Sequence, residues 1–397
     1  MSEIKDAVII SAVRTATGKF LGSLTPFSST DLGAIAVKEA VKRAGIKKED
    51  VSEVIMGSVV QAGLGQAPAR QAAIKAELPP EVSALTVNMV CGSGLRAVAL
   101  AAQAVKLGDS EFVVAGGMES MSNIPYSMPG ARTGYRMGNK TVVDLMVNDG
   151  LWCPFENWHM GNTGEVVAEK YQIGRDAQDE YATDSHRKAK EARDAGRFDE
   201  EIVSIEIPQR KKDPITFDKD ETIRDNTSVE GLSKLRPAFK KDGGTVTAGN
   251  SPSVNDGASA VVVTSAEKAK EMGVEPMAKI VAYATSGIEP KLIMLAPVQG
   301  IKNVLAKAGW TMDEVDLFEL NEAFSVQALG VMQELGMDME KVNVNGGAVA
   351  LGHAIGNSGS RILTTLLYEM KRRGVKKGVA ALCLGGGNSV AMAVERV

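Results

Sequence analysis

The sequence predicts an α/β fold made of two similar halves, with a long loop region inserted between them. Two segments recur: RAGIKKEDVSEVIMG at 43–57 resembles KAGWTMDEVDLFELN at 307–321, and SGLRAVALAAQAVKLG from Ser93 resembles SGSRILTTLLYEMKRRG from Ser358. Both copies alternate helical patterns with β-branched runs, which indicates mostly parallel, buried strands. Two matches at nearly one offset favour a duplicated structural unit.

The elements follow the same order in both copies. A helix that stops at a glycine leads into an acidic turn and a β-branched strand, and a second turn, helix and strand follow. The matching positions are Gly45 and Gly309, Ser93 and Ser358, and Gly117 and Cys383. We therefore expect equivalent elements to occupy equivalent places in the two halves.

The inserted region has a different character. It contains most of the tryptophan and several charge runs, including the helical segment EYATDSHRKAKEARDAGRF, where we expect His186 to be solvated. Insertions of this kind usually carry binding function above the strand ends of α/β folds. The predicted organisation is a first half over 1–119, an inserted loop domain over 120–247, a return to the first half over 248–275, and a second half over 276–397.

Composition excludes several functional classes. The 397 residues include 45 Lys and Arg against 49 Asp and Glu, a net charge of -4, so a nucleic-acid partner is not expected. The apolar runs are far shorter than the ~20 residues of a membrane span, and the start MSEIKDAVIISAVRT lacks the pattern of a signal peptide. Three scattered cysteines and three histidines offer no metal-site spacing. We expect a soluble protein of a reducing cytoplasm.

Cys91 is the first candidate for chemistry. It lies in ALTVNMVCGSGLRAVALAAQAV, where a strand gives way to a Gly-Ser-Gly turn and an Ala-rich helix. The partial positive charge at a helix start favours the thiolate, and the nearby backbone N–H groups can bind an oxyanion. The alternative is a buried, inert cysteine at a tight turn.

Three further positions stand out in glycine-rich surroundings. His353, in VNVNGGAVALGHAIGNSGSRI, can take a proton from a thiol near neutral pH, or it can simply bond loop backbone. Cys383 ends a strand before three glycines and is either a second reactive thiol or a small buried hydrophobe. Asn321, in ELNEAFS, stands where the first copy has Gly57 and is either functional or a turn former.

Taken together, these positions resemble a thiolase, specifically the acetoacetyl-CoA (biosynthetic) branch of that family, over practically the whole chain. The matching motifs are VIISAVRTATGKFLGSL, VNMVCGSGLRAV, HMGNTGEVVAEKY, KLRPAFKKDGGTVTAGN, NEAF, VNVNGGAVALGH and CLGGGN. The resemblance implies five stacked layers (αβαβα), with a loop domain that covers the active site, binds coenzyme A and mediates oligomerisation. It also implies a homotetramer.

The resemblance further implies an acyltransferase of fatty acid metabolism, an acetyl-CoA C-acetyltransferase. Such an enzyme reversibly condenses two acetyl-CoA to acetoacetyl-CoA and CoA through an acetyl-cysteine. CoA thioesters would be its substrates and it would need no cofactor. The alternative within the family is a degradative 3-ketoacyl-CoA thiolase that acts on longer or branched chains.

The same resemblance assigns roles residue by residue. Cys91 would be the acylated nucleophile, His353 its base, and Cys383 the acid and base at the α-carbon of the second acetyl group. Asn321 would hold a water that helps His353 stabilise the enolate, while the N–H groups of Cys91 and Gly385 would form the other oxyanion site. Coenzyme A would be bound by Leu151, His159, Met160, Arg224, Leu232, Phe239, Ala248 and Phe324, with Arg224 at the nucleotide end.

The sequence departs from the family pattern around the expected pocket. Ala354 follows the histidine where a proline is usual, and Gly231 and Pro252 stand where serines are usual, so Ser251 is the candidate to replace the second of these. Asn388 and Ser389 replace a usual Met-Gly after the last glycines. A decarboxylating ketoacyl synthase would carry a second histidine in place of Asn321, and a non-catalytic acyl-CoA-binding subunit would have lost a catalytic residue. The stretch from Met121 to Gly138 has the composition of an interface loop.

Overall fold

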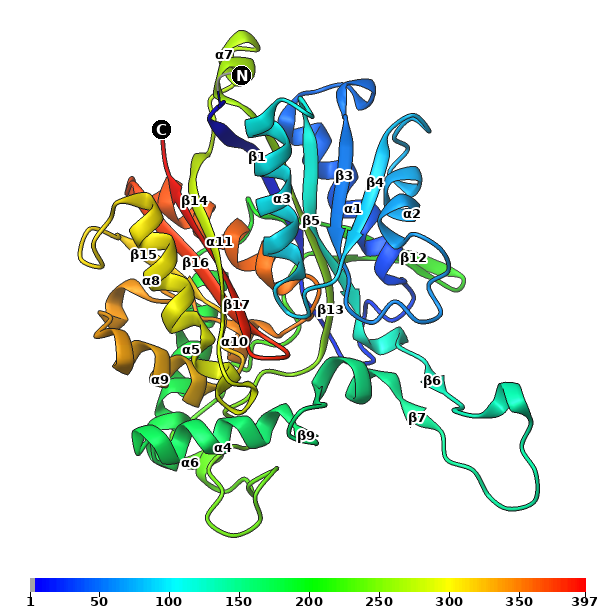
Figure 1. Ribbon diagram of the computed structural model, residues 1–397, viewed down its shortest axis with the longest axis vertical. Coiled ribbons are helices and arrows are strands. Elements are labelled where there is room, and N and C mark those ends of the chain that lie inside the picture. Colours follow the sequence, from blue (N-terminus) through cyan, green and yellow to red (C-terminus); the bar gives the residue numbers. More distant parts are fainter. Residues whose placement is uncertain (1–3) are drawn as a thin grey trace.

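A computed structural model describes residues 4–397 and shows two halves side by side (Figure 1). The strands form one path in the order β15-β16-β17-β14-β1-β13-β5-β3-β4. The first half contributes β1 (Ala7–Thr15), β13 (Asn255–Ser265), β5 (Val113–Ser120), β3 (Glu53–Gly57) and β4 (Ser83–Val87). The second half contributes β14 (Ala278–Gly287), β17 (Asn388–Glu395), β16 (Lys377–Leu384) and β15 (Leu317–Leu320). The halves join where β1 pairs with β14. The strands of the first half are called the first sheet and those of the second half the second sheet, although the two are continuous through this pair.

Three apolar clusters hold the layers together. Helices α1 (Ser29–Ala44) and α2 (Pro68–Lys75) pack on the outer face of the first sheet. Helices α3 (Ser93–Leu107) and α11 (Ser358–Arg373) lie between the two sheets and contact both. Helices α8 (Ala296–Ala308) and α9 (Ser325–Leu335) cover the outer face of the second sheet. This is the five-layered α/β arrangement, and the predicted fold class is confirmed.

The duplicated segments occupy equivalent places. The first half contains α1, β3, α3 and β5 in this order along the chain. The second half contains α8, β15, α11 and β16 in the same order, and other elements lie between some of them in both halves. The predicted helix stops are C-caps in the left-handed region, with φ of 67° at Gly45 and 71° at Gly309. A side chain would be strained there, so the glycines that the two copies share mark true helix ends.

The prediction of mostly parallel strands is wrong. Parallel pairing is found between β3 and its neighbours β4 and β5, and between β15 and β16. In contrast, β1, β13 and β5 pair antiparallel in succession, as do β16, β17 and β14. The repeat reveals only the strands joined through helices, whereas β17 returns from β16 through a short glycine turn and so must run antiparallel.

The inserted region makes a helical part and an arm. Helices α4 (Met160–Tyr171), α5 (Arg175–Asp194) and α6 (Val229–Ser233) lie beside the second half, and α4 and α5 contact α9. The strands β6 (Tyr126–Ser127) and β7 (Val143–Asp144) form the base of an arm, defined here as residues 124–145, that extends away from the body (Figure 1). The expectation that His186 is solvated is wrong, because it is 1% exposed and its Nδ1 accepts the backbone N–H of Arg224 at 3.1 Å.

One helix among residues 4–397, spanning Val90–Leu107, is long and apolar enough to resemble a membrane span. It contains α3, which is packed between the two sheets, so core burial accounts for its apolar composition.

Candidate active site

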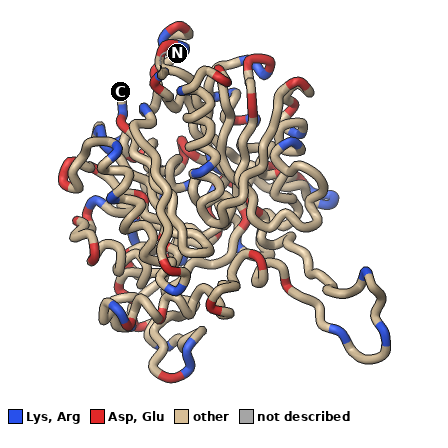
Figure 2. The backbone as a smooth tube through the Cα atoms, in the orientation of Figure 1, with Lys and Arg blue, Asp and Glu red and all other residues tan. Residues whose placement is uncertain are grey.

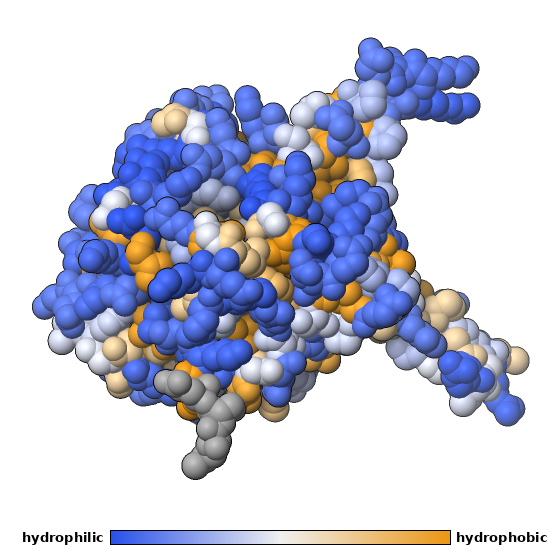
Figure 3. Space-filling model, turned by 90° about the horizontal axis from the view of Figure 1, so that it is seen from above, coloured by the Kyte–Doolittle hydropathy of each residue, from blue (hydrophilic) through white to orange (hydrophobic). Residues whose placement is uncertain are grey.

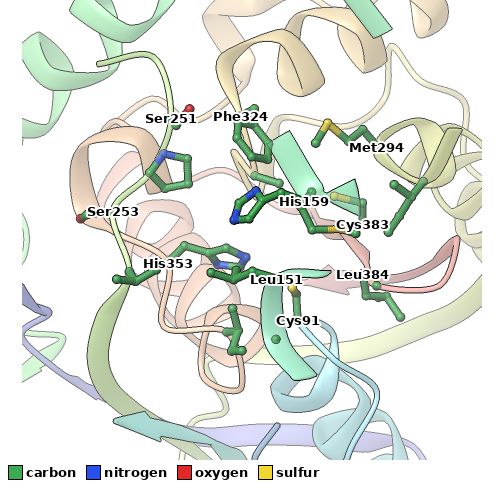
Figure 4. A pocket seen from close by; sticks show the side chains of 18 of the residues that line it. Cys91, Leu151, His159, Ser251, Ser253, Met294, Phe324, His353, Cys383 and Leu384 are labelled. Carbon is green, nitrogen blue, oxygen red and sulfur yellow. The ribbon is translucent and has the colours of Figure 1, made fainter. Parts of the chain in front are cut away.

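A cavity of about 130 Å³ opens where the two halves and the inserted region meet. Cys91, His353, Cys383 and Gly385 line it, and the first three side chains point toward one another (Figure 4). Asn321 is not among the lining residues, although Ala323 and Phe324 from the same turn are. Four of the five predicted catalytic positions thus share one space.

Cys91 lies in the turn between β4 and α3, two residues before the helix begins. Burial raises the pKa of its thiol to about 12, although N–H groups, including that of Gly385, bond to the sulfur and act in the opposite direction. The N–H bonds act in the direction expected of the helix start, which favours thiolate, but desolvation outweighs them. At rest the thiol holds its proton and needs a base.

His353 follows the short helix α10 (Ala348–Leu351) and is 8% exposed. Its Nδ1 lies 2.6 Å from the Ser358 hydroxyl, which donates its proton to the Ala354 carbonyl at 2.9 Å. With that proton directed at the Ala354 carbonyl, the matching tautomer has Nδ1 as the donor to the hydroxyl and Nε2 free to accept. Burial first, and then the charge of Arg361, lower the pKa of His353 to about 4, so the imidazole is neutral at physiological pH.

Cys383 stands near the end of β16 and is 5% exposed. Burial raises the pKa of this thiol, and the neighbouring Cys91 raises it further. The repeat places Gly117 at the corresponding point of β5, where a Cβ would come within 2.1 Å of the Gly356 carbonyl. The turn that follows His353 therefore leaves no room for a side chain in the first half, whereas β16 can place a thiol at the cavity.

Asn321 follows β15 and is fully buried. Its backbone N–H donates to Ala381 at 3.0 Å, but neither polar atom of its side-chain amide has a partner among the described residues. Buried amides are normally satisfied, often by an ordered water. The orphaned amide fits the predicted water-holding role, which remains a prediction.

Aromatic rings from the insertion and from the turn after β15 form one wall of the cavity. His159 stacks on Phe239 with ring centroids 4.7 Å apart, and Phe239 meets Phe324 edge-on at 6.2 Å. His159 caps α4, its Nδ1 accepts the N–H of Gly161, and burial lowers its pKa. These apolar faces suit the pantetheine of a CoA thioester.

The predicted CoA-binding residues divide into two groups. The cavity is lined by Leu151, His159, Met160, Phe239, Ser251 and Phe324. The structure does not bring the other three to it. Arg224 and Ala248 are exposed, and Leu232 packs in a small cluster with Ala182 and Val349. Arg224 at the nucleotide end remains a prediction.

The structure shows how the unusual residues are accommodated. Ser251 lines the cavity, but its hydroxyl already donates to the Thr247 carbonyl at 2.6 Å, so this group can only accept hydrogen bonds from a ligand. Pro252 lines the cavity beside it. Ser389 is buried, and its hydroxyl lies 2.6 Å from that of Ser286 and against Gly300 of α8.

Some residues of the site had no distinguishing signal in the sequence. Met121 and Ile355 belong to the apolar cluster against which Cys91 packs, and both line the cavity. Apolar residues in buried elements resemble ordinary core, so pattern reasoning does not separate them. Glu119, a buried carboxylate beside the site, was also missed, although an acidic residue in the apolar run FVVAGGMES is a recognisable anomaly.

Comparison with known proteins gives consistent matches along the chain. The model of the thiolase N-terminal domain matches residues 7–267, and that of the thiolase C-terminal domain matches residues 274–396. An acetyl-CoA acetyltransferase of Cupriavidus necator is 57% identical over 391 residues, covering 98% of this chain and 99% of the relative. One from Chromobacterium violaceum is 56% identical, covering 98% and 100%. The crystal structure of the Bacillus anthracis acetyl-CoA acetyltransferase superposes with a TM-score of 0.98 at 43% identity and covers all of both chains.

Proposed function

The chain belongs to the thiolase family, and we propose that its cavity carries out a two-step acyl transfer in which each lining side chain has a separate task. The protein is an acyltransferase, an acetyl-CoA C-acetyltransferase. The observation that carries the proposed mechanism is the convergence of two thiols and one neutral imidazole on a single apolar cavity (Figure 4).

In the first step Cys91 becomes acetylated. Nε2 of His353 takes the thiol proton while the sulfur attacks the thioester carbonyl of acetyl-CoA. The C–S bond to coenzyme A breaks, and the imidazolium returns the proton to the leaving CoA sulfur. The N–H groups of Cys91 and Gly385, which bond the sulfur at rest, would stabilise charge on the carbonyl oxygen.

In the second step a carbon–carbon bond forms. Cys383 passes its proton to His353, and the resulting thiolate removes an α-proton from a second acetyl-CoA. The enolate is stabilised by His353 and a water held on the Asn321 amide, and its carbon attacks the acetyl group on Cys91. The imidazolium then protonates the departing sulfur of Cys91, which leaves acetoacetyl-CoA and the starting thiols.

Acetylation of a single cysteine tests this assignment. After incubation with acetyl-CoA, intact and peptide mass spectrometry should place one acetyl group on Cys91. Cys91→Ala should remove both the label and all turnover, because no other group can form the acyl-enzyme. An adduct confined to Cys153 or Cys383 would mean that the nucleophile has been misassigned.

We further propose a homotetramer in a reducing, cytoplasmic setting. The mechanism needs both thiols unoxidised, and the exposed arm has the composition of an interface. CoA thioesters as substrates are consistent with a place in fatty acid metabolism. No cofactor enters the proposed steps, since the chain's own side chains supply every proton acceptor.

A further inference from the structure

Glu119 is a buried carboxylate at the end of β5 that the mechanism above does not use. It is 1% exposed and forms no ion pair among residues 4–397, yet its oxygens accept three backbone N–H groups. A carboxylate is costly to bury, and bonds to the backbone of neighbouring loops are the reason it can stay there. Which loops it binds is therefore informative.

On one side Glu119 holds the turn that carries the catalytic histidine. Its Oε2 accepts the N–H of Gly356 at 3.0 Å, three residues after His353. The contact is close, since a Cβ on Gly356 would lie 2.5 Å from the same oxygen. Gly356 thus rests directly on the carboxylate, which fixes the height of the turn above β5.

On the other side Glu119 holds the loop that follows β3. The N–H of Val59 donates to Oε2 at 2.9 Å and that of Val60 to Oε1 at 3.3 Å. The carbonyl of Val59 then accepts the side-chain amide of Asn88 at 3.1 Å. These hydrogen bonds therefore connect Glu119, through the loop after β3, to the segment that precedes the nucleophile.

Asn88 also bonds the backbone next to Cys91. Its Oδ1 accepts the N–H of Val90 at 3.0 Å, one residue before the nucleophile. Val90 has a φ of 46°, a backbone conformation that is unfavourable for a β-branched residue and persists only when its surroundings fix it. The hydroxyl of Ser93 bonds the same turn through the Val90 carbonyl.

We propose that Glu119 is a positioning residue that sets the distance between Cys91 and His353, by bonding the histidine turn directly and the cysteine turn through Val59 and Asn88. The inference rests on the proposed function, because it concerns the proton transfer between those two side chains. A displacement of about 1 Å between reacting groups can cost on the order of 10²-fold in rate. A single buried carboxylate that ties both turns is suited to prevent it.

The test replaces Glu119 by Gln, which keeps the shape but presents an amide N–H toward backbone N–H groups. The kcat for acetoacetyl-CoA thiolysis should fall by on the order of 10- to 10²-fold with little change in KM, since substrate contacts are untouched. The single-turnover rate of Cys91 acetylation by acetyl-CoA should fall in parallel, because that step also depends on proton transfer to His353. Glu201→Gln is the control, since that buried carboxylate bonds Arg14 and Thr365, outside both turns.

A second variant keeps the test decisive if Glu119→Gln folds poorly. Asn88→Ala removes the bonds to Val59 and Val90, leaves the bond between Glu119 and the histidine turn in place, and should give the same split between kcat and KM. If the two residues act in one chain, the double variant should lose no more than the worse single variant, rather than the product of both losses. Multiplicative losses, or a folded Glu119→Gln enzyme with kcat within about threefold of the parent, would overturn the proposal. Failure of the unaltered enzyme to form acetyl-Cys91 would instead overturn the proposed function.

Discussion

At the scale of single residues, the resting site contains no ion pair between its nucleophile and its base. The pKa of Cys91 is raised to about 12 and that of His353 is lowered to about 4, both mainly by burial. A neutral thiol beside a neutral imidazole is stable in an apolar cavity, and charge separation occurs only when substrate accepts it. The enzyme thereby avoids a permanently reactive thiolate.

The pH dependence of alkylation tests this resting state. Between pH 7 and 9.5 the rate of Cys91 modification by iodoacetamide should rise by about tenfold per pH unit, because the thiolate fraction of an acid with a higher pKa does so. The Cys91→Ser variant measures the alkylation of the other cysteines, which is subtracted to give the rate at Cys91. A plateau below pH 8 would reveal a preformed thiolate–imidazolium pair.

Cys383 should be separable from Cys91 because it acts on the second substrate. Cys383→Ala should still accept an acetyl group on Cys91, while condensation and thiolysis fall by about 10²–10⁴-fold, as is typical when a general acid or base is lost. Trapped acetyl label measures the first step, and the absorbance of the acetoacetyl-CoA enolate measures the second. Near-normal thiolysis would reduce Cys383 to a packing residue and refute the two-thiol mechanism.

Residue identity was easier to predict than residue environment. Glycine-rich motifs around Cys91, His353 and Cys383 were visible in the sequence, and the structure brings all three to one cavity. The pKa of Cys91 and the burial of His186 were not predictable, because both depend on chain segments distant in sequence that pack over them. The local sequence pattern predicts the helix start next to Cys91, which lowers the pKa of the thiol. It does not predict the desolvation that raises this pKa by more.

At the scale of elements, the close packing of α8 against β17 predicts that replacing Gly300 of α8 lowers the stability of the protein. Alanine in place of a helix-interior glycine normally gains roughly 0.5–1 kcal/mol. A Cβ on Gly300, however, would lie 2.3 Å from the hydroxyl of Ser389, which is held by Ser286. Gly300→Ala should therefore destabilise the protein by about 1–3 kcal/mol through overpacking.

Urea unfolding measures that effect, and a compensating change supplies the control. Ser389→Gly removes the hydroxyl that the new methyl group would meet. The double variant should recover stability to above that of Gly300→Ala alone, because these residues are in contact and their effects are coupled. Additive losses would show that another neighbour of α8 sets the limit.

At the scale of the whole molecule, the duplicated segments predicted the layers but not the strand directions. Gly45 and Gly309 end equivalent helices, and this was visible as a shared glycine. The strands β1, β13, β14 and β17 carry no such shared signal, and their antiparallel pairing depends on which distant segments become neighbours. The return to the first half over 248–275 stays a prediction as a boundary, and β13, which follows the insertion in the sequence, lies between β1 and β5.

The arm of residues 124–145 has few contacts with the body of the protein and exposes apolar side chains. It holds together by two short strands, and its side chains leave apolar surface uncovered, with Met137 fully exposed and Tyr126 64% exposed. The right-most projection in the space-filling view is accordingly a mixture of apolar and polar residues (Figure 3). Its outer part carries only positive charge, from Arg132, Arg136 and Lys140 (Figure 2).

A projection of this kind is expected to be covered by other copies of the chain, because an isolated two-stranded ribbon is marginally stable in water and exposed apolar patches mark interfaces. Light scattering at micromolar concentration should give the mass of four chains. Replacing residues 128–142 by a short Gly-Ser linker should yield a smaller assembly with an unchanged far-ultraviolet spectrum, since that segment contributes little to the core. Replacing a different surface turn, Gln209–Lys212 between β11 (Ile205–Gln209) and β12 (Lys212–Phe217), by the same linker should leave the assembly intact. A monomeric mass for the unaltered protein would show that the arm has another role.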